Sequence, residues 1–296
     1  MLNVKRLQSR AAFFRAIRSW FENHGFLEVD TPLRQPLVIP EQNISHIPST
    51  THFLQSSPEL YMKRLLGGGC EQIYQICRCF RHGERGRLHL EEFVMLEWYR
   101  KDADYKDLMR DCESLCRFLC AAIPEHELPV AVESPWEYLT VAEAFAKHSS
   151  MSAEEALAQD LFDELLVEDV EPQLGKNRPT FLYDYPLELA SLARQKPDQT
   201  EIAERFELYV SGVELANGFS ELTDPEIQRS RFAEEYAKMG CVDTGQQRIP
   251  EKFLNSLASI DQAAGIAMGL DRLFMLFLGE SCVENVISFS PEELDV

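Results

Sequence analysis

One stretch of the chain combines residue types that could hold a polyanion at one end and a small cation at the other. Arg81 follows an apolar, strand-like run (72–80) and opens a charged loop that contains glycine. A second run, 93–99, carries Glu97 and Tyr99 near its far end. Guanidinium groups bind phosphate oxygens, and carboxylates bind ammonium groups. This hairpin predicts an enzyme that uses ATP and acts on an amino-bearing substrate.

Three glutamates recur at seven-residue spacing, at Glu207, Glu214 and Glu221. On one regular strand, an odd spacing places Glu207 and Glu214 on opposite faces, and a bulge at Gly212 would return them to a common side. Carboxylates of this kind bind Mg²⁺ beside nucleotide phosphates, or bind ammonium groups. The alternative is a set of surface glutamates in an acid-rich protein, and the spacing alone does not separate these interpretations.

A third pattern ends in Arg272. Small residues alternate with larger ones from Gly265 to Gly269, and an arginine then opens an apolar helix. Glycines let a ligand approach the backbone, and an arginine can clamp a phosphate with two hydrogen bonds. Neither of the two common phosphate loops, GxxxxGK[ST] and GxGxxG, occurs in the sequence. If ATP binds, arginines and metal ions must therefore neutralise its phosphates.

Composition narrows the class of protein. The 29 basic and 49 acidic side chains give a net charge of −20, so we expect tRNA or DNA to be repelled unless the charge is unevenly spread. The apolar stretch 266–278 is interrupted by Asp271 and Arg272 and cannot span a membrane. Because no signal peptide is apparent, we expect a cytoplasmic protein whose eight cysteines are reduced and act as small apolar groups.

Hydrophobic periodicity and turn residues predict the elements that must position these patterns. The expected elements are helices at 5–24, 60–66, 104–122 and 270–278, a strand at 26–32, a loop at 34–51 and an exposed acidic amphipathic helix at 151–171. The run 206–215 alternates as a strand, and Asn217-Gly218 predicts a turn after it. Strands at irregular intervals favour an α+β fold with an antiparallel sheet flanked by helices.

Taken together, the three patterns resemble the class II aminoacyl-tRNA synthetases. Arg81 with its loop is similar to motif 2 of that family, 265–272 to motif 3, and the first helix and strand to motif 1. The segments 52–66 and 97–99 resemble the lysyl-tRNA synthetases in particular. The resemblance implies a class II catalytic core in a single domain over 1–296, and a homodimer formed through motif 1.

The resemblance also implies roles in binding ATP and Mg²⁺. Arg81 would bind the α-phosphate, Arg272 would hold the γ-phosphate, and Phe93 would stack on adenine. Glu207 and Glu214 would hold Mg²⁺. The full set of residues implied in nucleotide binding is Arg81, His82, Gly83, Glu84, His89, Leu90, Phe93, Glu214, Leu215, Gly269 and Arg272.

A second set of residues would bind a lysine-like substrate. Its members are Ser57, Pro58, Glu59, Glu97, Tyr99, Glu221 and Ala267. By resemblance, Ser57 and Glu59 would contact the backbone-like end of the substrate, whereas Glu97, Tyr99 and Glu221 would surround its ε-ammonium. A buried cation requires paired carboxylates, which explains why glutamates occur at these positions.

Two positions depart from the family pattern. Family members often have glutamate where this chain has Gly83, and the acid comes one position later, at Glu84. The family sequence His-Asn-Pro-Glu-Phe is His89-Leu-Glu-Glu-Phe93 in this chain. Leu90 cannot make the polar contact that an asparagine makes. Both changes put nucleotide contacts in question and leave the fold unaffected.

The position of motif 1 narrows the resemblance further. It begins within a few residues of Met1, so we expect no N-terminal anticodon-binding OB-fold and no anticodon-dependent tRNA binding. The chain is then similar to the lysyl-tRNA synthetase paralogues that attach (R)-β-lysine to translation elongation factor P. Lysyl-tRNA synthetases typically have glycine at the position of Ala267, and those paralogues have alanine. An added methyl group in a pocket wall can discriminate between lysine isomers.

Two alternatives stay open. The protein could instead be a stand-alone enzyme that activates lysine and charges tRNA or another carrier. It could also be a catalytically inactive regulatory paralogue, although the intact Arg81, Arg272 and the three glutamates at seven-residue spacing argue against this interpretation.

Overall fold

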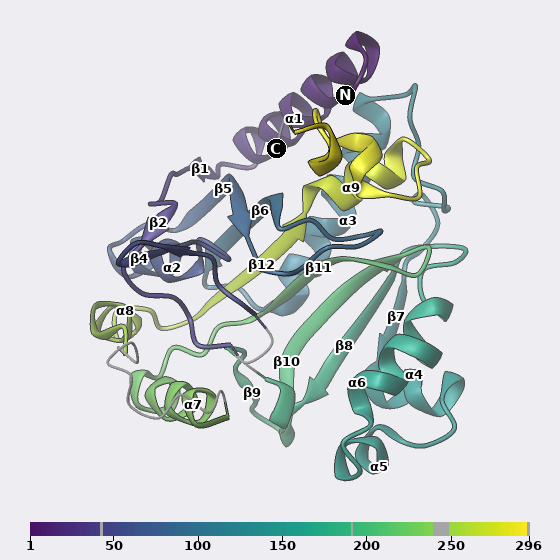
Figure 1. Ribbon diagram of the computed structural model, residues 1–296. Helices are drawn as coiled ribbons and strands as arrows, with labels where there is room; N and C mark the ends of the chain where they lie inside the picture. The colour runs from purple at the N-terminus through teal and green to yellow at the C-terminus, as the bar shows by residue number, and fades with distance from the viewer. Residues whose placement is uncertain (42–43, 191, 239–248, 295–296) are drawn as a thin grey trace.

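The computed structural model describes every residue of the chain except 42–43, 191, 239–248 and 295–296. A mixed nine-stranded sheet in this described part has the order β1-β5-β6-β12-β11-β10-β8-β7, with β9 paired to β10 (Figure 1). A second, small sheet contains β2, β4 and β3. The strands are β1 (Leu27–Glu28), β2 (Arg34–Gln35), β3 (Pro48–Ser49), β4 (His52–Leu54), β5 (Gln72–Phe80), β6 (Glu92–Lys101), β7 (Glu137–Thr140), β8 (Thr180–Pro186), β9 (Gln195–Lys196), β10 (Gln199–Val210), β11 (Val213–Ser220) and β12 (Ala263–Gly269).

Helices cover the sheet and lie beside its edge strands. They are α1 (Val4–Asn23), α2 (Glu59–Gly67), α3 (Tyr105–Ala122), α4 (Val141–His148), α5 (Ala153–Ala158), α6 (Phe162–Leu165), α7 (Pro225–Lys238), α8 (Glu251–Leu257) and α9 (Leu270–Phe277). Shorter helical turns occupy Leu166–Val170, Glu171–Gln173, Leu187–Leu189, Val283–Val286 and Pro291–Glu293. The helices predicted at 5–24, 60–66, 104–122 and 270–278 are therefore confirmed, each with bounds shifted by no more than a residue or two.

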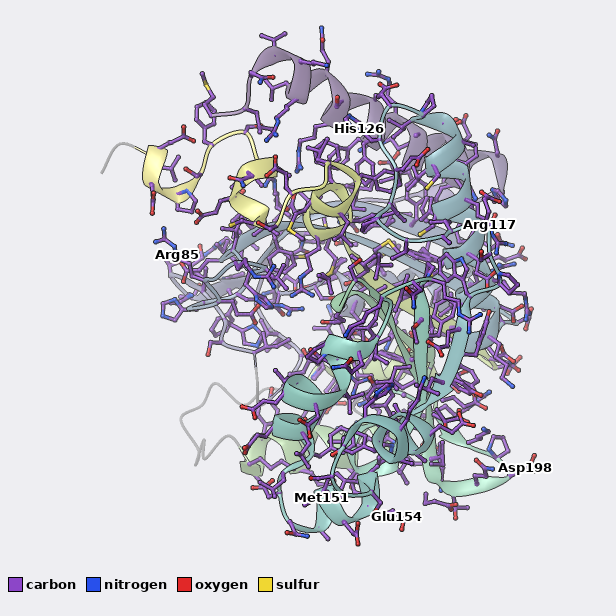
Figure 2. The ribbon with its side chains drawn as sticks, turned by 90° about the vertical axis from the view of Figure 1, so that its right-hand side faces the viewer. Arg85, Arg117, His126, Met151, Glu154 and Asp198 are labelled. Atoms are coloured by element: carbon purple, nitrogen blue, oxygen red, sulfur yellow. The ribbon has the colours of Figure 1, made fainter. Side chains whose placement is uncertain are left out.

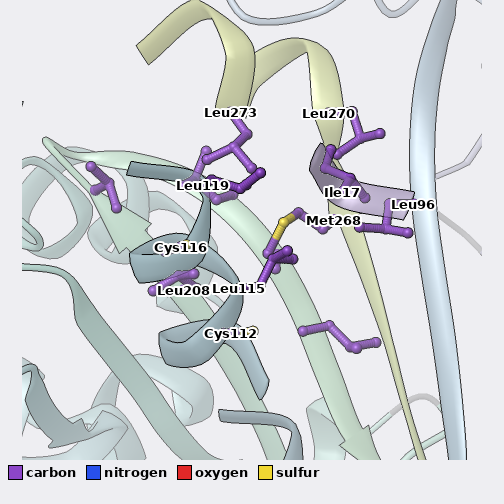
Figure 3. Close-up of a cluster of buried hydrophobic side chains, with 14 of the residues drawn as sticks. Ile17, Leu96, Cys112, Leu115, Cys116, Leu119, Leu208, Met268, Leu270 and Leu273 are labelled. Carbon is purple, nitrogen blue, oxygen red and sulfur yellow. The ribbon is translucent and has the colours of Figure 1, made fainter. Parts of the chain in front are cut away.

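Side chains of the sheet divide between its two faces by the strand period of two. On β6, Leu96 and Trp98 belong to the main hydrophobic core, together with residues of α1, α3 and α9. Glu97 and Tyr99 alternate with them and line a cavity instead. Figure 3 shows the core side of this arrangement, where the leucines and cysteines of α3 gather with Met268 of β12. The alternation therefore leaves polar side chains on the face that these three helices do not cover.

The cysteines of α3 behave as the sequence predicts. Cys112 and Cys116 are completely buried in the main core, and each is a free thiol. Burial raises the pKa of the Cys116 thiol, which keeps it neutral. These residues therefore act as small apolar groups within the core.

The predicted α+β fold is confirmed, with two differences at the sheet edges. The central strands pair antiparallel, but β1 pairs with β5 in parallel, and β7 pairs with β8 in parallel. The strand predicted at 26–32 contributes only the two residues of β1, and the loop predicted at 34–51 contains β2 and β3. β1 pairs with β5 and β2 with β4, which are distant in sequence, so local periodicity does not reveal these pairings; β3 instead pairs with the adjacent β4 through a short turn.

The turn predicted at Asn217-Gly218 is wrong. The hairpin between β10 and β11 turns at Ser211 and Gly212, which have φ values of 53° and 72°. Two successive positive φ angles suit a tight turn between twisted strands. Gly212 therefore makes the turn and is not a bulge within one strand. Gly218 lies inside β11, where a Cβ would come within 2.7 Å of the Phe206 ring.

The single exposed helix predicted at 151–171 is also wrong. This segment contains α5, α6 and two further helical turns, with a left-handed residue, Asp160 (φ 58°), between the two helices. Phe162, Leu166 and Val170 are buried against α4 and β8. The segment thus buries apolar side chains and exposes most of its acidic ones, as an amphipathic segment should. It is not one helix, because the chain turns at Asp160. Figure 2 shows Met151 and Glu154 at one end of the molecule, far from Arg85 of the β5–β6 loop.

Candidate active site

A cavity of about 260 Å³ lies on the face of the sheet opposite the main core. Strands β6, β11 and β12 contribute to its lining, together with the β5–β6 loop and the segment before α2. It brings together these site residues predicted from the sequence: Ser57, Glu59, Arg81, Glu84, His89, Leu90, Phe93, Glu97, Tyr99, Glu214, Leu215, Ala267, Gly269 and Arg272. The other predicted residues, outside this lining, are Pro58, His82, Gly83, Glu207 and Glu221.

Glu97 forms the centre of the acidic end of this cavity. Glu97 is only 1% exposed. Its carboxylate accepts hydrogen bonds from the Ser57 hydroxyl at 2.5 Å and the Tyr99 hydroxyl at 3.0 Å. Both donors are neutral, so they orient the carboxylate without cancelling its charge. Burial, with repulsion from Glu59, raises the pKa of Glu97 to about 8. An ammonium group is the natural partner for a carboxylate held in this way.

Glu221 and Lys63 lie behind this end of the cavity. The Lys63 ammonium is 2.5 Å from Oε2 of Glu221 and also pairs with Glu59. It lies 5.1 Å from the ring centroid of Phe219, and the residue is only 1% exposed. The sequence analysis missed Lys63, although its four-residue spacing from Glu59 on a helix could have indicated the ion pair. Burial raises the pKa of Glu221 to about 8, against the lowering effect of Lys63.

Gly265 makes room for this acidic end. It lies opposite Tyr99 in the β12–β6 pairing. A Cβ at this position would come within 2.2 Å of the Tyr99 ring and 2.4 Å of Oε1 of Glu221. Only glycine therefore lets the backbone of β12 approach these two side chains.

We expect Gly265→Ala to weaken binding of the amino-acid substrate by about tenfold or more, because the added methyl group displaces both Tyr99 and Glu221. Isothermal titration calorimetry measures the change in Kd. Gly86→Ala is the matched control, since a Cβ at Gly86 meets no atom within 4 Å. Equal loss of affinity in the two variants would contradict this assignment.

Arg81 lies toward the other end of the cavity. Its guanidinium carbon is 5.3 Å from the ring centroid of Phe93, and its NH1 is 3.7 Å from a carboxylate oxygen of Glu84. Among the described residues, its buried Nε has no hydrogen-bond partner. Since a buried donor without a partner is costly, this guanidinium is suited to receive an anionic ligand beside an aromatic ring.

Arg272 joins three parts of the chain at the same end. Its NH1 donates to the Glu214 carbonyl oxygen at 2.9 Å and to the Glu214 carboxylate at 3.1 Å. Its Nε donates to the Leu88 carbonyl at 3.1 Å, and its NH2 lies 2.5 Å from Nε2 of His89. The first turn of α9 thus holds a guanidinium against the β5–β6 loop and β11. Burial and the neighbouring Arg272 lower the pKa of His89, so it is neutral at pH 7.

Glu207 and Glu214 lie on the two strands of one hairpin. Glu214 lines the cavity, whereas Glu207 is buried and accepts from Tyr185 and Tyr209 hydroxyls, each at 2.6 Å, and from Arg205 at 2.7 Å. Burial raises the pKa of Glu207, and Glu214 adds to the effect, so a nearby cation would relieve two adjacent carboxylates.

This pair of oxygen ligands suits Mg²⁺. Within the described part of the chain, no group of three histidine, cysteine, aspartate or glutamate side chains is arranged to hold a metal ion. Mg²⁺ commonly takes one or two carboxylates and completes its coordination with phosphate and water oxygens. Glu214, which lines the cavity beside Arg272, could supply one such carboxylate, and Glu207 could supply a second in place of its pairing with Arg205.

The structure also shows where the residues at the two positions that depart from the family pattern lie. Gly83 has φ 76° and donates its backbone N–H to Glu91 at 2.6 Å, outside the cavity lining. Glu84, one position later, lines the cavity. Leu90 is 4% exposed and packs in the main core while touching the cavity. An acid is therefore available at Glu84, but Leu90 offers the cavity only apolar surface.

Two further acidic residues near the cavity were missed by the sequence analysis. Glu41 lines it, and burial followed by repulsion from Glu59 raises the pKa of Glu41 to about 7. Glu171 accepts from the Tyr209 hydroxyl at 3.0 Å, and burial raises its pKa to about 7. Glu41 comes from a segment predicted as a loop and Glu171 from the end of the predicted acidic helix 151–171, so no local signal distinguishes either from a surface glutamate.

None of the helices in the described residues combines the length and apolarity that crossing a membrane requires.

The order of these strands, the arginines at the hairpin and at α9, and the acidic cavity define a class of protein. The family model for tRNA synthetases class II (D, K and N) matches residues 3–293, so the chain belongs to this family. Among curated proteins, it is 36% identical to the elongation factor P–(R)-β-lysine ligase of Salmonella gallinarum, over 98% of this chain and 96% of that protein. It is 35% identical to the enzymes of the same name from Salmonella dublin and Salmonella paratyphi B, with the same coverage.

Proposed function

We propose that this protein activates (R)-β-lysine with ATP and transfers it to a lysine ε-amino group of translation elongation factor P. The names of its relatives support this reaction. The observation that carries it is a single cavity with two chemically opposite ends. Glu97, Tyr99 and the adjacent Glu221 suit an ammonium group, and Arg81 and Arg272 suit phosphates.

In the first step, a carboxylate oxygen of the amino acid attacks the α-phosphorus of ATP. The new P–O bond forms as the bond to pyrophosphate breaks, giving an aminoacyl adenylate. Arg81 neutralises charge that develops on the α-phosphate, and Arg272 holds the γ-phosphate. Mg²⁺ held by Glu207 and Glu214 would supply further positive charge to the phosphates. The carboxylate is already a nucleophile, so positioning provides most of the acceleration.

In the second step, the acceptor ε-amine attacks the carbonyl carbon of the adenylate. An amide bond forms, AMP leaves with the electron pair of the broken C–O bond, and the amine loses a proton. The net charge of −20 favours a protein acceptor over tRNA, whose phosphates such a surface repels. We therefore propose that anticodon-dependent tRNA binding plays no part.

ATP–pyrophosphate exchange with (R)-β-lysine beside L-α-lysine tests the first step, and labelled product tests the second. We expect preferred exchange with the β isomer and label on elongation factor P. Label on tRNA and not on the factor would favour the lysine-activating alternative. A folded protein that supports no exchange with either isomer would favour an inactive regulatory paralogue.

Ala267 is expected to set the choice of lysine isomer. It lines the cavity and packs beside Cys77, Cys79 and Met95, so its methyl group is held in a fixed place in the wall. We expect Ala267→Gly to shift the ratio of kcat/KM values toward L-α-lysine by about tenfold, the usual effect of one methyl group. The exchange assay measures both isomers with the same enzyme preparation, and an unchanged ratio would remove the pocket-wall explanation.

We further propose a cytoplasmic homodimer of single catalytic domains over 1–296. One hydrophobic core that extends from Phe13 to Val286 supports a single domain. Leu7 and Leu27 are exposed apolar residues in the segment that resembles motif 1, and the exposed Leu33 follows this segment directly, which supports a dimer contact there. Sedimentation analysis with Leu27→Asp tests this surface, because a dimer that forms through it would dissociate.

A further inference from the structure

A buried lysine on α2 has no role in the reaction described above. Lys63 is 1% exposed, its ammonium pairs with Glu59 and lies 2.5 Å from Glu221, and neither Lys63 nor Glu221 belongs to the cavity lining. Lys63 also lies 5.1 Å from the Phe219 ring centroid. A charge held this deeply requires partners, and both of its partners are carboxylates at the acidic end of the cavity.

The charges at this end can be summed. Glu41, Glu59, Glu97 and Glu221 carry four negative charges when ionised, and Lys63 carries one positive charge, which leaves three negative charges. An amino acid with two ammonium groups supplies two positive charges. In the proposed reaction its carboxylate would lie toward Arg81, at the other end of the cavity, and does not enter this sum.

We propose that Lys63 is a specificity-determining residue that lowers the negative charge of this cavity toward the charge of a substrate with two ammonium groups. The inference rests on the proposed function and deepens it. Lys63 acts through Glu59 and Glu221 without touching the substrate. An aliphatic residue in its place would leave one more uncompensated negative charge than in wild type, and protons would compete with the substrate for it.

The competition between protons and substrate gives the inference a measurable consequence. Substrate ammonium groups bind ionised carboxylates, and Lys63 favours the ionised forms of Glu97 and Glu221. Without Lys63, these carboxyl groups keep their protons to higher pH. The titratable and charged groups that face Lys63 across this region are Glu41, Glu59, Glu97, Tyr99 and Glu221. The pH at which substrate affinity reaches half of its maximum must therefore rise when Lys63 is neutralised.

The test measures Kd by calorimetry from pH 6 to pH 9 for (R)-β-lysine and for (R)-3-aminohexanoic acid, which lacks the terminal amine. We expect wild type to prefer the diamino acid by about 100-fold. Lys63→Met should raise the pH midpoint by about one unit and reduce this preference about tenfold or more. A residue that only stabilises the fold would weaken both ligands equally at every pH.

A charge-compensated variant provides the matched control. Lys63→Met combined with Glu221→Gln removes one charge of each sign, so the net charge of the wild-type cavity is restored. We expect its pH midpoint to return to within about half a unit of wild type, although its affinity is lower. If Lys63→Met alone does not fold, as judged by thermal unfolding, the double variant carries the test, and a raised midpoint in it overturns the inference.

The remaining outcomes separate the two proposals. Wild-type protein that binds the diamino acid, with an unchanged midpoint and preference in Lys63→Met, overturns the role of Lys63 alone. Wild-type protein that binds neither lysine isomer overturns the proposed function and this inference with it.

Discussion

Replacing Arg81 with alanine is expected to reduce ATP–pyrophosphate exchange by about 10³-fold or more. Arg81 lines the cavity beside Phe93, and its buried Nε has no hydrogen-bond partner in the part of the chain that the structure describes. A guanidinium placed in this way stabilises negative charge that develops on a phosphate during the reaction, and removing it affects kcat more than binding. Single-turnover formation of the adenylate measures the loss directly.

Arg78→Ala is the matched control for this variant. Arg78 lies near the end of β5, shortly before Arg81, but its side chain is 49% exposed, pairs at 3.5 Å with Glu92 and lies outside the cavity lining. We expect its exchange rate to stay within about twofold of wild type, because exposed ion pairs contribute little. A loss of similar size in both variants would show that removing either positive charge reduces exchange, and that the position of Arg81 is not what matters.

The second large effect is expected for Glu97→Gln, which should weaken binding of the lysine-like substrate by about 100-fold. The Ser57 and Tyr99 hydroxyls orient the Glu97 carboxylate, and an amide keeps the shape of the side chain but not its charge. Truncating one partner of a buried ion pair leaves the other charge without compensation. Calorimetric Kd values with and without a non-hydrolysable ATP analogue measure the effect.

The raised pKa of Glu97 predicts how this binding depends on pH. Because the Glu97 pKa is about 8, the empty cavity holds a proton on this group at pH 7, and binding an ammonium group releases it. Substrate affinity in wild type should therefore rise as the pH increases through about 8, and this dependence should be reduced in Glu97→Gln. An unchanged pH profile in the variant would indicate that another group holds the proton.

The same pKa shift has the opposite consequence for stability. The pKa of the Glu97 carboxyl group is raised from 4.5 to about 8 in the folded protein. The free energy of unfolding therefore falls as the pH rises through that interval. Ligand-free Glu97→Gln should therefore melt at a higher temperature than wild type at pH 8, although it binds substrate weakly. Glu92→Gln, on the exposed side of the same strand, should change neither the Tm nor the Kd.

The sequence predicted the hairpin at Arg81 and the helix that begins near Arg272 because both depend on local patterns. An alternating run forms a strand wherever it pairs, and an apolar run that ends in glycine forms a helix wherever it packs. The period of two explains why Glu97 and Tyr99 share the cavity face of β6. Given the motif resemblance, the sequence could therefore name most of the residues that line the cavity.

The β10–β11 hairpin shows where local patterns fail. Asn217-Gly218 has the composition of a turn, but the chain turns at Ser211-Gly212, and Gly218 is required by the ring of Phe206 on the paired strand. Glu207 and Glu214 consequently lie on neighbouring strands, so their spacing along one strand does not decide whether they meet. The contact that favours one turn over the other is a contact between strands, which no window of sequence contains.

At the site, Lys63 shows the same limit of prediction from local sequence patterns. The sequence by itself determined its spacing from Glu59 and the presence of an acidic set at Glu97 and Glu221. Only the tertiary structure decided that α2 covers the sheet so closely that Lys63 loses its contact with water and must share its charge with Glu221, more than 150 residues away in sequence. The energy of a charge depends on what surrounds it in space, and burial is set by the packing of segments that are distant in the chain.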